Sequence, residues 1–228
     1  MPFYVLKVGG SLMATARDLV RSLVALKGEG YSFLVVPGGG PMADLVREIY
    51  SRGSLSQEAA HWMAVLAMEQ YARFLADGTG AALTTELTTE PTTEKTIELI
   101  TDAVHLPAGG GCAGMRILLP YQALLRDDFG IEHNWDCTSD AVAALVAARL
   151  RAPLIKATDV DGIFLTEKAE REISAARLLG VESCLDQGTV RLLCSRLQGS
   201  NIWILNGSDP QKFILSLKRG EGGTVVKG

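Results

Sequence analysis

The chain has 228 residues, of which 47% are hydrophobic and 21% are charged. This balance is typical of a folded globular protein and excludes a disordered or fibrous chain. Lysine and arginine number 22 and aspartate and glutamate 26, so the formal net charge is −4. That charge favours neither a nucleic acid nor a membrane surface as a partner.

Short apolar strands alternate with helical periods along the whole chain. The predicted strands are Phe3–Val8, Phe33–Val36, Arg116–Leu119, Leu154–Ala157, Ile202–Leu205 and Thr224–Val226. The predicted helices are Ala14–Lys27, Met42–Tyr50, Gln57–Ala76, Ser139–Leu150, Thr189–Leu197 and Pro210–Leu217. Such alternation predicts an α/β fold: a three-layer αβα sandwich with a central, mostly parallel sheet.

The helix predicted at Gln57–Ala76 is apolar almost all round, particularly from Trp62 to Met68. Helices of this kind are buried against other helices. We therefore expect Trp62 and Met68 in the core, and a homo-oligomer in which this helix contributes to the subunit contact.

One segment departs from the strand–helix rhythm. Thr84–Thr96 has the sequence TTELTTEPTTEKT, a TTE repeat with a period of four. Low complexity and Pro91, which excludes a central strand, predict an exposed connection or hairpin. No strong linker is present elsewhere, so a single domain spanning 1–228 is expected, divided only loosely near residue 133.

Two glycine-rich turns each join a strand to a helix, in the motifs LKVGGSL and LVVPGGGPM. Glycines let backbone N–H groups approach an anion, and the helix that follows adds partial positive charge. Lys7 adds a full charge at the carboxyl end of its strand, where open α/β sheets bind ligands. Two such turns at adjacent strand ends predict two phosphate or carboxylate groups that face each other.

Two further motifs lie in the second half of the chain. WDCTSD places Asp140 in the first turn of a helix, where its carboxylate either suits the helix dipole or holds lysines in position. IKATDVDG places Lys156 at a strand end, ahead of a tight turn that contains Asp159, Asp161 and Gly162.

Cysteine and histidine usage favours a cytoplasmic protein with reduced thiols. The four cysteines lie far apart without a CxxC pair, and Lys7 interrupts the N-terminal apolar stretch, so no signal peptide is predicted. His133, Asp136 and Cys137 suggest a metal site, but two further ligands at zinc spacing are missing. A loop is therefore favoured there, and no metal ligand is assigned.

Together these motifs resemble those of the amino acid kinase family, in the family's order from Val5 to Val226. The resemblance implies phosphoryl transfer with ATP and Mg²⁺, and a catalytic set of Lys7, Asp140 and Lys156 in which Asp140 orients the lysines. It assigns phosphate and nucleotide binding to Gly9, Gly10, Ser11, Thr158, Asp159, Asp161 and Gly162. It also implies an acceptor-binding lobe over 1–132 and a nucleotide-binding lobe over 133–228.

The same resemblance places the acceptor, a small molecule, at the second glycine turn, Gly38, Gly39 and Gly40. His61 either donates a hydrogen bond to an acceptor phosphate or lies on a helix surface. Trp135 either stacks on a ring of the acceptor or packs ahead of the helix that follows it.

Some residues depart from the family pattern. The GGM…K segment of acetylglutamate-type kinases is absent, so the second lysine is Lys156 or is missing. Uridylate kinases carry an arginine ahead of the long helix to hold the nucleotide acceptor, and SLSQEAAHWMAVLAMEQY offers none. The HWM helix, LPY at 119–121 and WDCTSD are most similar to a branch associated with methanofuran-type cofactor synthesis, whose kinase phosphorylates an aminomethylfuran-methyl phosphate to its diphosphate.

Three alternatives stay open or are disfavoured. A uridylate or acylamino-acid kinase of the same family is the nearest alternative. A non-catalytic nucleotide- or oxyanion-binding protein would keep the glycine turns but lose the lysines, and both Lys7 and Lys156 are present. A dinucleotide-dependent oxidoreductase would need GxGxxG after a strand, and neither glycine turn has that spacing.

Overall fold

The computed structural model describes residues 2–88 and 114–228, which contain one eight-stranded sheet of order β3-β4-β2-β1-β5-β7-β8-β6. All neighbouring strands are parallel except β7 and β8, which are antiparallel. The strands are β1 (Phe3–Val8), β2 (Ser32–Pro37), β3 (Ala82–Thr84), β4 (Met115–Leu118), β5 (Leu154–Thr158), β6 (Glu172–Ser174), β7 (Asn201–Asn206) and β8 (Thr224–Lys227).

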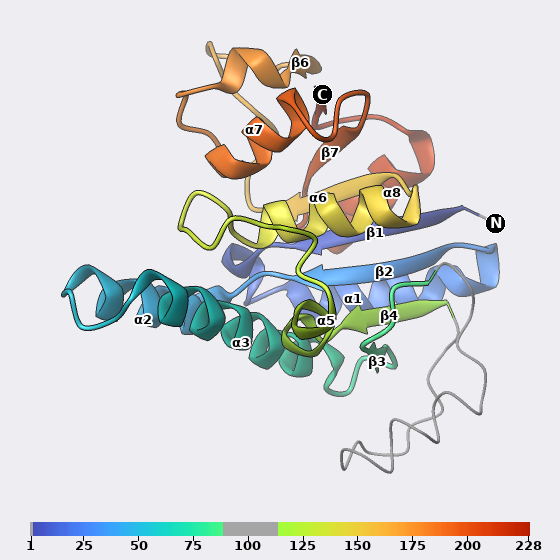
Figure 1. The fold of residues 1–228 in the computed structure, drawn as a ribbon. Coiled ribbons are helices and arrows are strands. Elements are labelled where there is room, and N and C mark those ends of the chain that lie inside the picture. Colours follow the sequence, from blue (N-terminus) through green and yellow to red (C-terminus); the bar gives the residue numbers. More distant parts are fainter. Residues whose placement is uncertain (1, 89–113) are drawn as a thin grey trace.

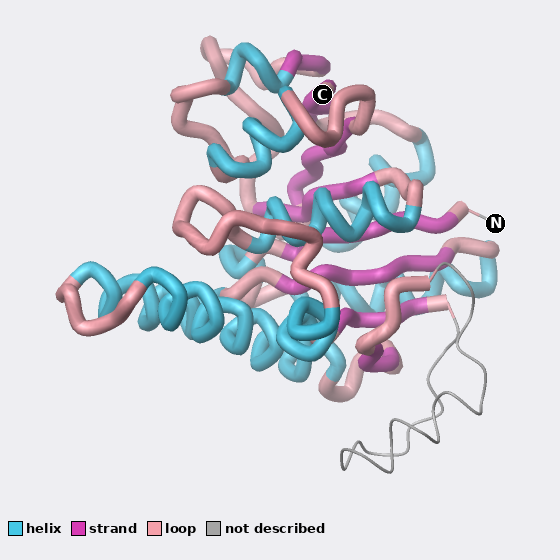
Figure 2. The backbone as a smooth tube through the Cα atoms, in the orientation of Figure 1, coloured by secondary structure: helices cyan, strands magenta, loops and turns pink. Residues whose placement is uncertain are grey.

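Helices cover both faces of this sheet (Figures 1 and 2). They are α1 (Ala16–Ala25), α2 (Gly40–Ser51), α3 (Gln57–Ala76), α5 (Pro120–Arg126), α6 (Ser139–Leu150), α7 (Gln187–Cys194) and α8 (Pro210–Arg219). One buried core joins α6 and α7 to one face, and a second joins α1 and α8 to the other. The predicted three-layer αβα sandwich is therefore confirmed.

Alternation along β1 decides which side chains reach each layer. Leu6 and Val8 pack with α1, whereas Val5 packs with α6, because successive strand residues face opposite sides. Lys7 shares the parity of Val5 and lies opposite Lys156 of β5 in the parallel register. Both lysines consequently project toward the α6 layer.

Local sequence explains where several helices begin and end. Ser56 caps α3 by accepting a hydrogen bond from the Ala59 N–H, and Asp209 caps α8 just before Pro210. Gly220 ends α8 in the left-handed region, at φ 67°. The helices α2 and α3 pack side by side and extend beyond the sheet on the left of Figure 1.

The structure adds elements that periodicity did not predict and corrects one expectation. The strands β3 and β6 have three residues each and α5 has seven, too short for a periodic pattern. Thr84 and Thr85, the start of the Thr/Glu repeat, are buried, and Thr84 closes β3, so this part is not an exposed connection. Residues 89–96 lie outside the described residues.

Within 2–88 and 114–228, the longest and most apolar helices still fall short of what a bilayer crossing requires.

Candidate active site

A buried cluster of two ammonium groups and one carboxylate lies on the α6 face of the sheet. Asp140 Oδ1 is 2.8 Å from Lys7 Nζ, and Asp140 Oδ2 is 2.5 Å from Lys156 Nζ. All three side chains are more than nine-tenths buried. The three residues expected to form the catalytic set are thus brought together, near the carboxyl end of β1, in the middle of β5 and in the first turn of α6. Lys156 therefore lies within its strand and not at the strand end that the sequence predicted, because β5 continues to Thr158.

The electrostatics of the cluster follow from its burial and its charge count. Burial acts to raise the pKa of Asp140, but the attraction of Lys156 and Lys7 outweighs it and holds that pKa well below its ordinary value. Burial lowers the pKa of Lys7, with Asp140 opposing this and Lys156 adding to it. Two cations and one anion leave the cluster with an excess positive charge that suits an incoming anion.

A segment that precedes α7 completes the cluster and was not predicted from the sequence. The Cys184 carbonyl accepts a hydrogen bond from Lys156 Nζ. Two residues on, Asp186 accepts from the Thr138 N–H at 2.9 Å and from the Thr138 hydroxyl at 2.6 Å, and it caps α7. Burial and the nearby Asp140 raise the pKa of Asp186. This segment therefore fixes both Lys156 and the turn that leads into α6.

The two predicted glycine turns touch each other. A Cβ on Gly10 would come within 2.5 Å of Gly40 Cα, and a Cβ on Gly38 within 2.9 Å of Gly10 N. Gly40 has φ 55°, a left-handed conformation that favours glycine. Among the described residues, the N–H groups of Gly10 and Ser11 donate to no protein acceptor. The turns therefore form one close-packed surface with open backbone donors.

The predicted nucleotide residues lie beside the first glycine turn. The Ser11 hydroxyl donates to Asp159 Oδ1 at 2.9 Å and lowers the pKa of that carboxyl, and Thr158 donates to the same oxygen at 3.2 Å. Asn206 of β7 donates to Asp161 Oδ1 at 2.7 Å. Gly162 has φ 147°, and a Cβ there would meet the Thr224 hydroxyl at 2.5 Å.

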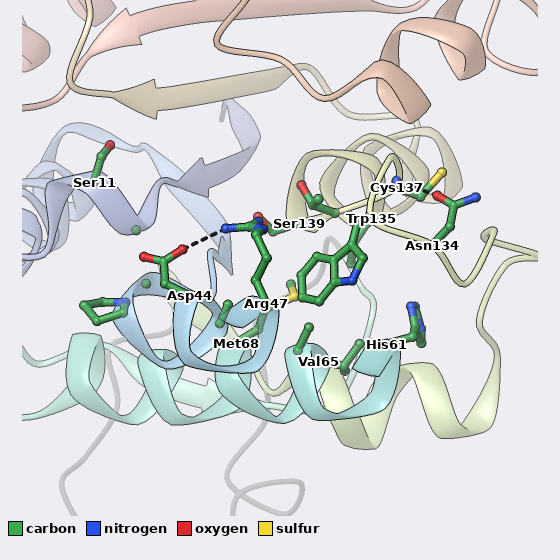
Figure 3. A pocket seen from close by; sticks show the side chains of 18 of the residues that line it. Ser11, Asp44, Arg47, His61, Val65, Met68, Asn134, Trp135, Cys137 and Ser139 are labelled. Atoms are coloured by element: carbon green, nitrogen blue, oxygen red, sulfur yellow. Dashed lines mark hydrogen bonds and ion pairs between the residues drawn. The ribbon is translucent and has the colours of Figure 1, made fainter. Parts of the chain in front are cut away.

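A cavity of about 380 Å³ opens beside the glycine turns (Figure 3). It is lined from α2, α3, the first turn of α6 and the segment ahead of α6, by Gly10, Ser11, Gly39, Gly40, Pro41, Ala43, Asp44, Arg47, Gln57, His61, Ala64, Val65, Met68, Asn134, Trp135, Cys137, Thr138, Ser139 and Val142. Gly39, Gly40, His61 and Trp135 of the predicted acceptor set therefore share one cavity, whereas Gly38 lies just behind it against Gly10.

His61 is buried, with 8% of its surface exposed, so the alternative of a helix-surface histidine is wrong. Its ring stacks on His133 with centroids 3.8 Å apart, and its Nε2 is buried without a hydrogen-bond partner among the described residues. Burial and the neighbouring His133 lower the pKa of His61 to about 4. A neutral imidazole thus borders the cavity.

Trp135 packs against one cationic neighbour and one aromatic neighbour. The Arg47 guanidinium lies 4.9 Å from its ring centroid, and Tyr50 approaches from 5.9 Å. Arg47 is held by an ion pair of 2.8 Å with Asp44, visible in Figure 3. Both expected roles of Trp135, packing and access to the cavity, are therefore available at once.

Arg47 corrects the expectation that the acceptor side has no arginine. The stretch 54–71, SLSQEAAHWMAVLAMEQY, contains none, yet α2 brings Arg47 to the cavity from one helix earlier. Of the core residues expected in α3, Met68 is buried and Trp62 is half-buried. His133, Asp136 and Cys137 lie in a loop, as favoured, and no metal-binding group of three or more His, Cys, Asp or Glu side chains occurs in 2–88 and 114–228.

Known proteins resemble this chain over nearly its whole length. It is 28% identical to [5-(aminomethyl)furan-3-yl]methyl phosphate kinase from Methanocaldococcus jannaschii over 216 residues, covering 92% of this chain and 91% of that protein. Uridylate kinase from Archaeoglobus fulgidus superposes with a TM-score of 0.62 at 19% identity, over 98% of this chain and 99% of that one. UMP kinase from Bacillus anthracis gives 0.65 at 14% identity, over 100% and 97%.

The amino acid kinase family model matches residues 2–182, which include the lysine–aspartate cluster and both glycine turns. The structural likenesses show the same fold. The chain therefore belongs to the amino acid kinase family and is a phosphotransferase.

Proposed function

We propose that this enzyme transfers the γ-phosphoryl group of ATP to a small phosphate monoester, with [5-(aminomethyl)furan-3-yl]methyl phosphate as the expected acceptor and its diphosphate as the product. The observation that carries the proposal is the buried Lys7–Asp140–Lys156 cluster next to a cavity that is lined by the glycine turn with open backbone N–H donors. The relative at 28% identity supports this acceptor.

In this mechanism the protein positions two anions in line and neutralises their charge. Lys7 and Lys156 bind the transferring phosphoryl group, and Asp140 fixes both ammonium groups in direction. The N–H groups of Gly10 and Ser11 bind phosphate oxygens on the donor side. Because a phosphate acceptor is already anionic at neutral pH, no strong general base is needed.

ATP and Mg²⁺ fit the residues present. Mg²⁺ is commonly held through substrate phosphates with only one or two carboxylates, and the described residues offer isolated carboxylates at Asp159 and Asp161 rather than a metal cage. Mg²⁺ would supply charge neutralisation on the phosphates. Thr158, Asp159, Asp161 and Gly162 then form the nucleotide side, within the lobe over 133–228.

The acceptor binds in the 380 Å³ cavity in this proposal. His61 lines the cavity, and its Nε2, which is buried without a partner among the described residues, donates to an acceptor phosphate oxygen in the tautomer that carries its proton there. Trp135 offers a face for a ring, and Asp44 is the lining carboxylate that can pair with an ammonium. Two other carboxylates, Glu58 and Glu69, are less suited, since neither is among the residues that line this cavity.

A uridylate kinase is the second candidate. Arg47 is compatible with it, because a guanidinium in the acceptor cavity can pair with a nucleotide phosphate as readily as with a furan phosphate. The positive charge of Arg47 therefore supports a phosphate acceptor over an apolar one. It does not distinguish uridylate from the furan phosphate, which differ in the ring that the cavity must accept.

Turnover with MgATP tests the proposal when three acceptors are compared: the aminomethylfuran phosphate, UMP and N-acetylglutamate. ADP release gives the rate, and ³¹P NMR identifies a diphosphate product. We expect the highest kcat/KM with the aminomethylfuran phosphate. Efficient use of UMP alone would overturn the acceptor assignment, and ATP binding without turnover of any acceptor would favour a nucleotide-binding protein.

We further infer a cytoplasmic homo-oligomer with α3 at the subunit contact. Leu66 on α3 and Leu45 on α2 are exposed at 41% and 58% and support an apolar contact there. Light scattering gives the mass in solution, and Leu66→Lys is expected to shift it toward the monomer. An unchanged oligomer in that variant would contradict the α3 contact.

A further inference from the structure

A single side chain links the cavity helix α3 to the first glycine turn. Tyr71 lies in α3 and is fully buried, and its ring stacks on Phe74 with centroids 5.8 Å apart. Its hydroxyl donates to the Gly9 carbonyl at 3.3 Å. A Cβ built on Gly40 would lie 3.8 Å from the same ring. Tyr71 therefore touches both glycine turns at once.

The Gly9 carbonyl and the Gly10 N–H belong to one peptide unit. That unit is planar and trans, so its carbonyl and N–H point in opposite directions. The carbonyl accepts from the Leu12 N–H at 3.2 Å as well as from Tyr71. With the carbonyl held by two donors, the Gly10 N–H is directed away from the Tyr71 hydroxyl.

The Gly10 N–H is one of the open donors of the turn. A Cβ at position 38 would come within 2.9 Å of its nitrogen, so glycine at 38 keeps this N–H accessible. Burial raises the pKa of Tyr71, which keeps the hydroxyl a donor at every pH where the enzyme would work. The hydroxyl is thus a permanent donor to the peptide that carries a phosphate-facing N–H.

We propose that Tyr71 is a positioning residue: its hydroxyl sets the direction of the Gly9–Gly10 peptide and so aims the Gly10 N–H at the phosphoryl donor. This inference rests on the proposed function, in which that N–H binds a phosphate of ATP. The same hydrogen bond connects the first glycine turn to α3, the helix that lines the acceptor cavity.

The variant Tyr71→Phe removes only the hydroxyl and keeps the ring against Gly40 and Phe74. Tyr4→Phe is the control, since Tyr4 lies in β1 away from the turn, is partly buried against the same core, and stacks on Tyr31 and Phe33. We expect Tyr71→Phe to lower kcat/KM for ATP about five- to tenfold, the size of one lost hydrogen bond. The KM of the acceptor should stay within about twofold, and Tyr4→Phe should leave both constants unchanged.

A merely structural role would lower the melting temperature and leave the kinetic constants of the folded enzyme unchanged, and that result would overturn the proposal. Hydrogen exchange of the peptide spanning residues 6–13 gives a readout that needs no turnover. Exchange should be faster in Tyr71→Phe than in the wild type. In the variant the Gly9 carbonyl, which accepts from the Leu12 N–H, is no longer also held by the Tyr71 hydroxyl. If wild-type enzyme turns over no acceptor, the proposed function fails, while unchanged exchange in Tyr71→Phe fails the positioning role alone.

Discussion

The two ends of the site differ in how they are built. At the charged end, Lys7 and Lys156 lie opposite each other on neighbouring strands and Asp140 lies at a helix start, so the positions of the lysines follow from sheet register. At the aromatic end, His61, Trp135 and Arg47 come from two helices and a loop that no strand pairing fixes. In the proposed function, the sheet therefore specifies the phosphoryl-transfer chemistry, and the helices and the loop select the acceptor.

The largest expected effect is on stability at the charged end. Asp140→Asn leaves two buried ammonium groups without a counterion, and removing one partner of a buried ion pair costs about 3–5 kcal/mol. We expect the free energy of unfolding, measured in urea at pH 7, to fall by about that amount and turnover to be lost. Asp18→Asn, an exposed partner of Arg21, is the control and should change little.

The pH dependence of that effect has a definite sign. The pKa of Asp140 is depressed in the folded protein, so its stabilisation is fully present above the ordinary carboxyl value of 3.8 and is lost as the pH falls through the folded pKa. Wild type and Asp140→Asn should therefore converge in stability below pH 3.8. A constant difference between them down to the lowest pH would contradict the pairing.

The next effect is on the rate. Lys7→Ala and Lys156→Ala are each expected to lower kcat by about a hundredfold or more, since each removes a preorganised charge from the transferring group. Lys218→Ala is the matched control, because Lys218 is a surface lysine paired with Glu29 at 2.7 Å. Near-normal turnover in a folded variant would remove that lysine from the catalytic set.

A smaller effect is expected at the aromatic end. Arg47→Ala should raise the KM of the acceptor about tenfold to a hundredfold, the range for a hydrogen bond to a charged group, and leave the KM of ATP unchanged. Arg52→Ala, at the end of the same helix and paired with Glu48, serves as the control. Equal changes in both KM values would show that the two ends are not separable.

The smallest effect is expected for His61. Replacing it by alanine should raise the acceptor KM about three- to tenfold, and His61→Gln, which keeps an N–H donor near the position of Nε2, should recover part of the loss. Because the pKa of His61 is about 4, the imidazole is neutral from pH 5 to 8, and the ratio of the acceptor KM values of His61→Gln and wild type should be flat there. A tenfold change in that ratio near pH 6.5 would show that His61 titrates in the site.

Much of the charged end could be predicted because its determinants are local. The strand, turn and helix around Lys7 are consecutive residues, and the same holds for Lys156 and its aspartate turn. The Cys184 carbonyl could not be predicted, since it reaches Lys156 only after the chain has passed through β6 and back. Arg47 and Tyr71 were missed for the same reason: each is an ordinary helix residue until packing places it.

The fold itself shows the same limit. Long periodic elements such as α3 were predicted with their observed bounds, whereas β3 and β6 have too few residues for any pattern. The Thr/Glu repeat shows how composition misleads, since its first two threonines are buried beside β4. Burial there depends on a strand neighbour that is distant in sequence.

The pairing of Lys7 with Lys156 across β1 and β5 has a further consequence for how the protein can fail. A slip of one residue between these strands would send one lysine through the sheet to the α1 and α8 side, since side chains alternate from face to face. In the proposed mechanism a misregistered molecule would therefore be inert however compact it was. The specific activity of a purified sample would then fall with the fraction of molecules whose central strands are misaligned.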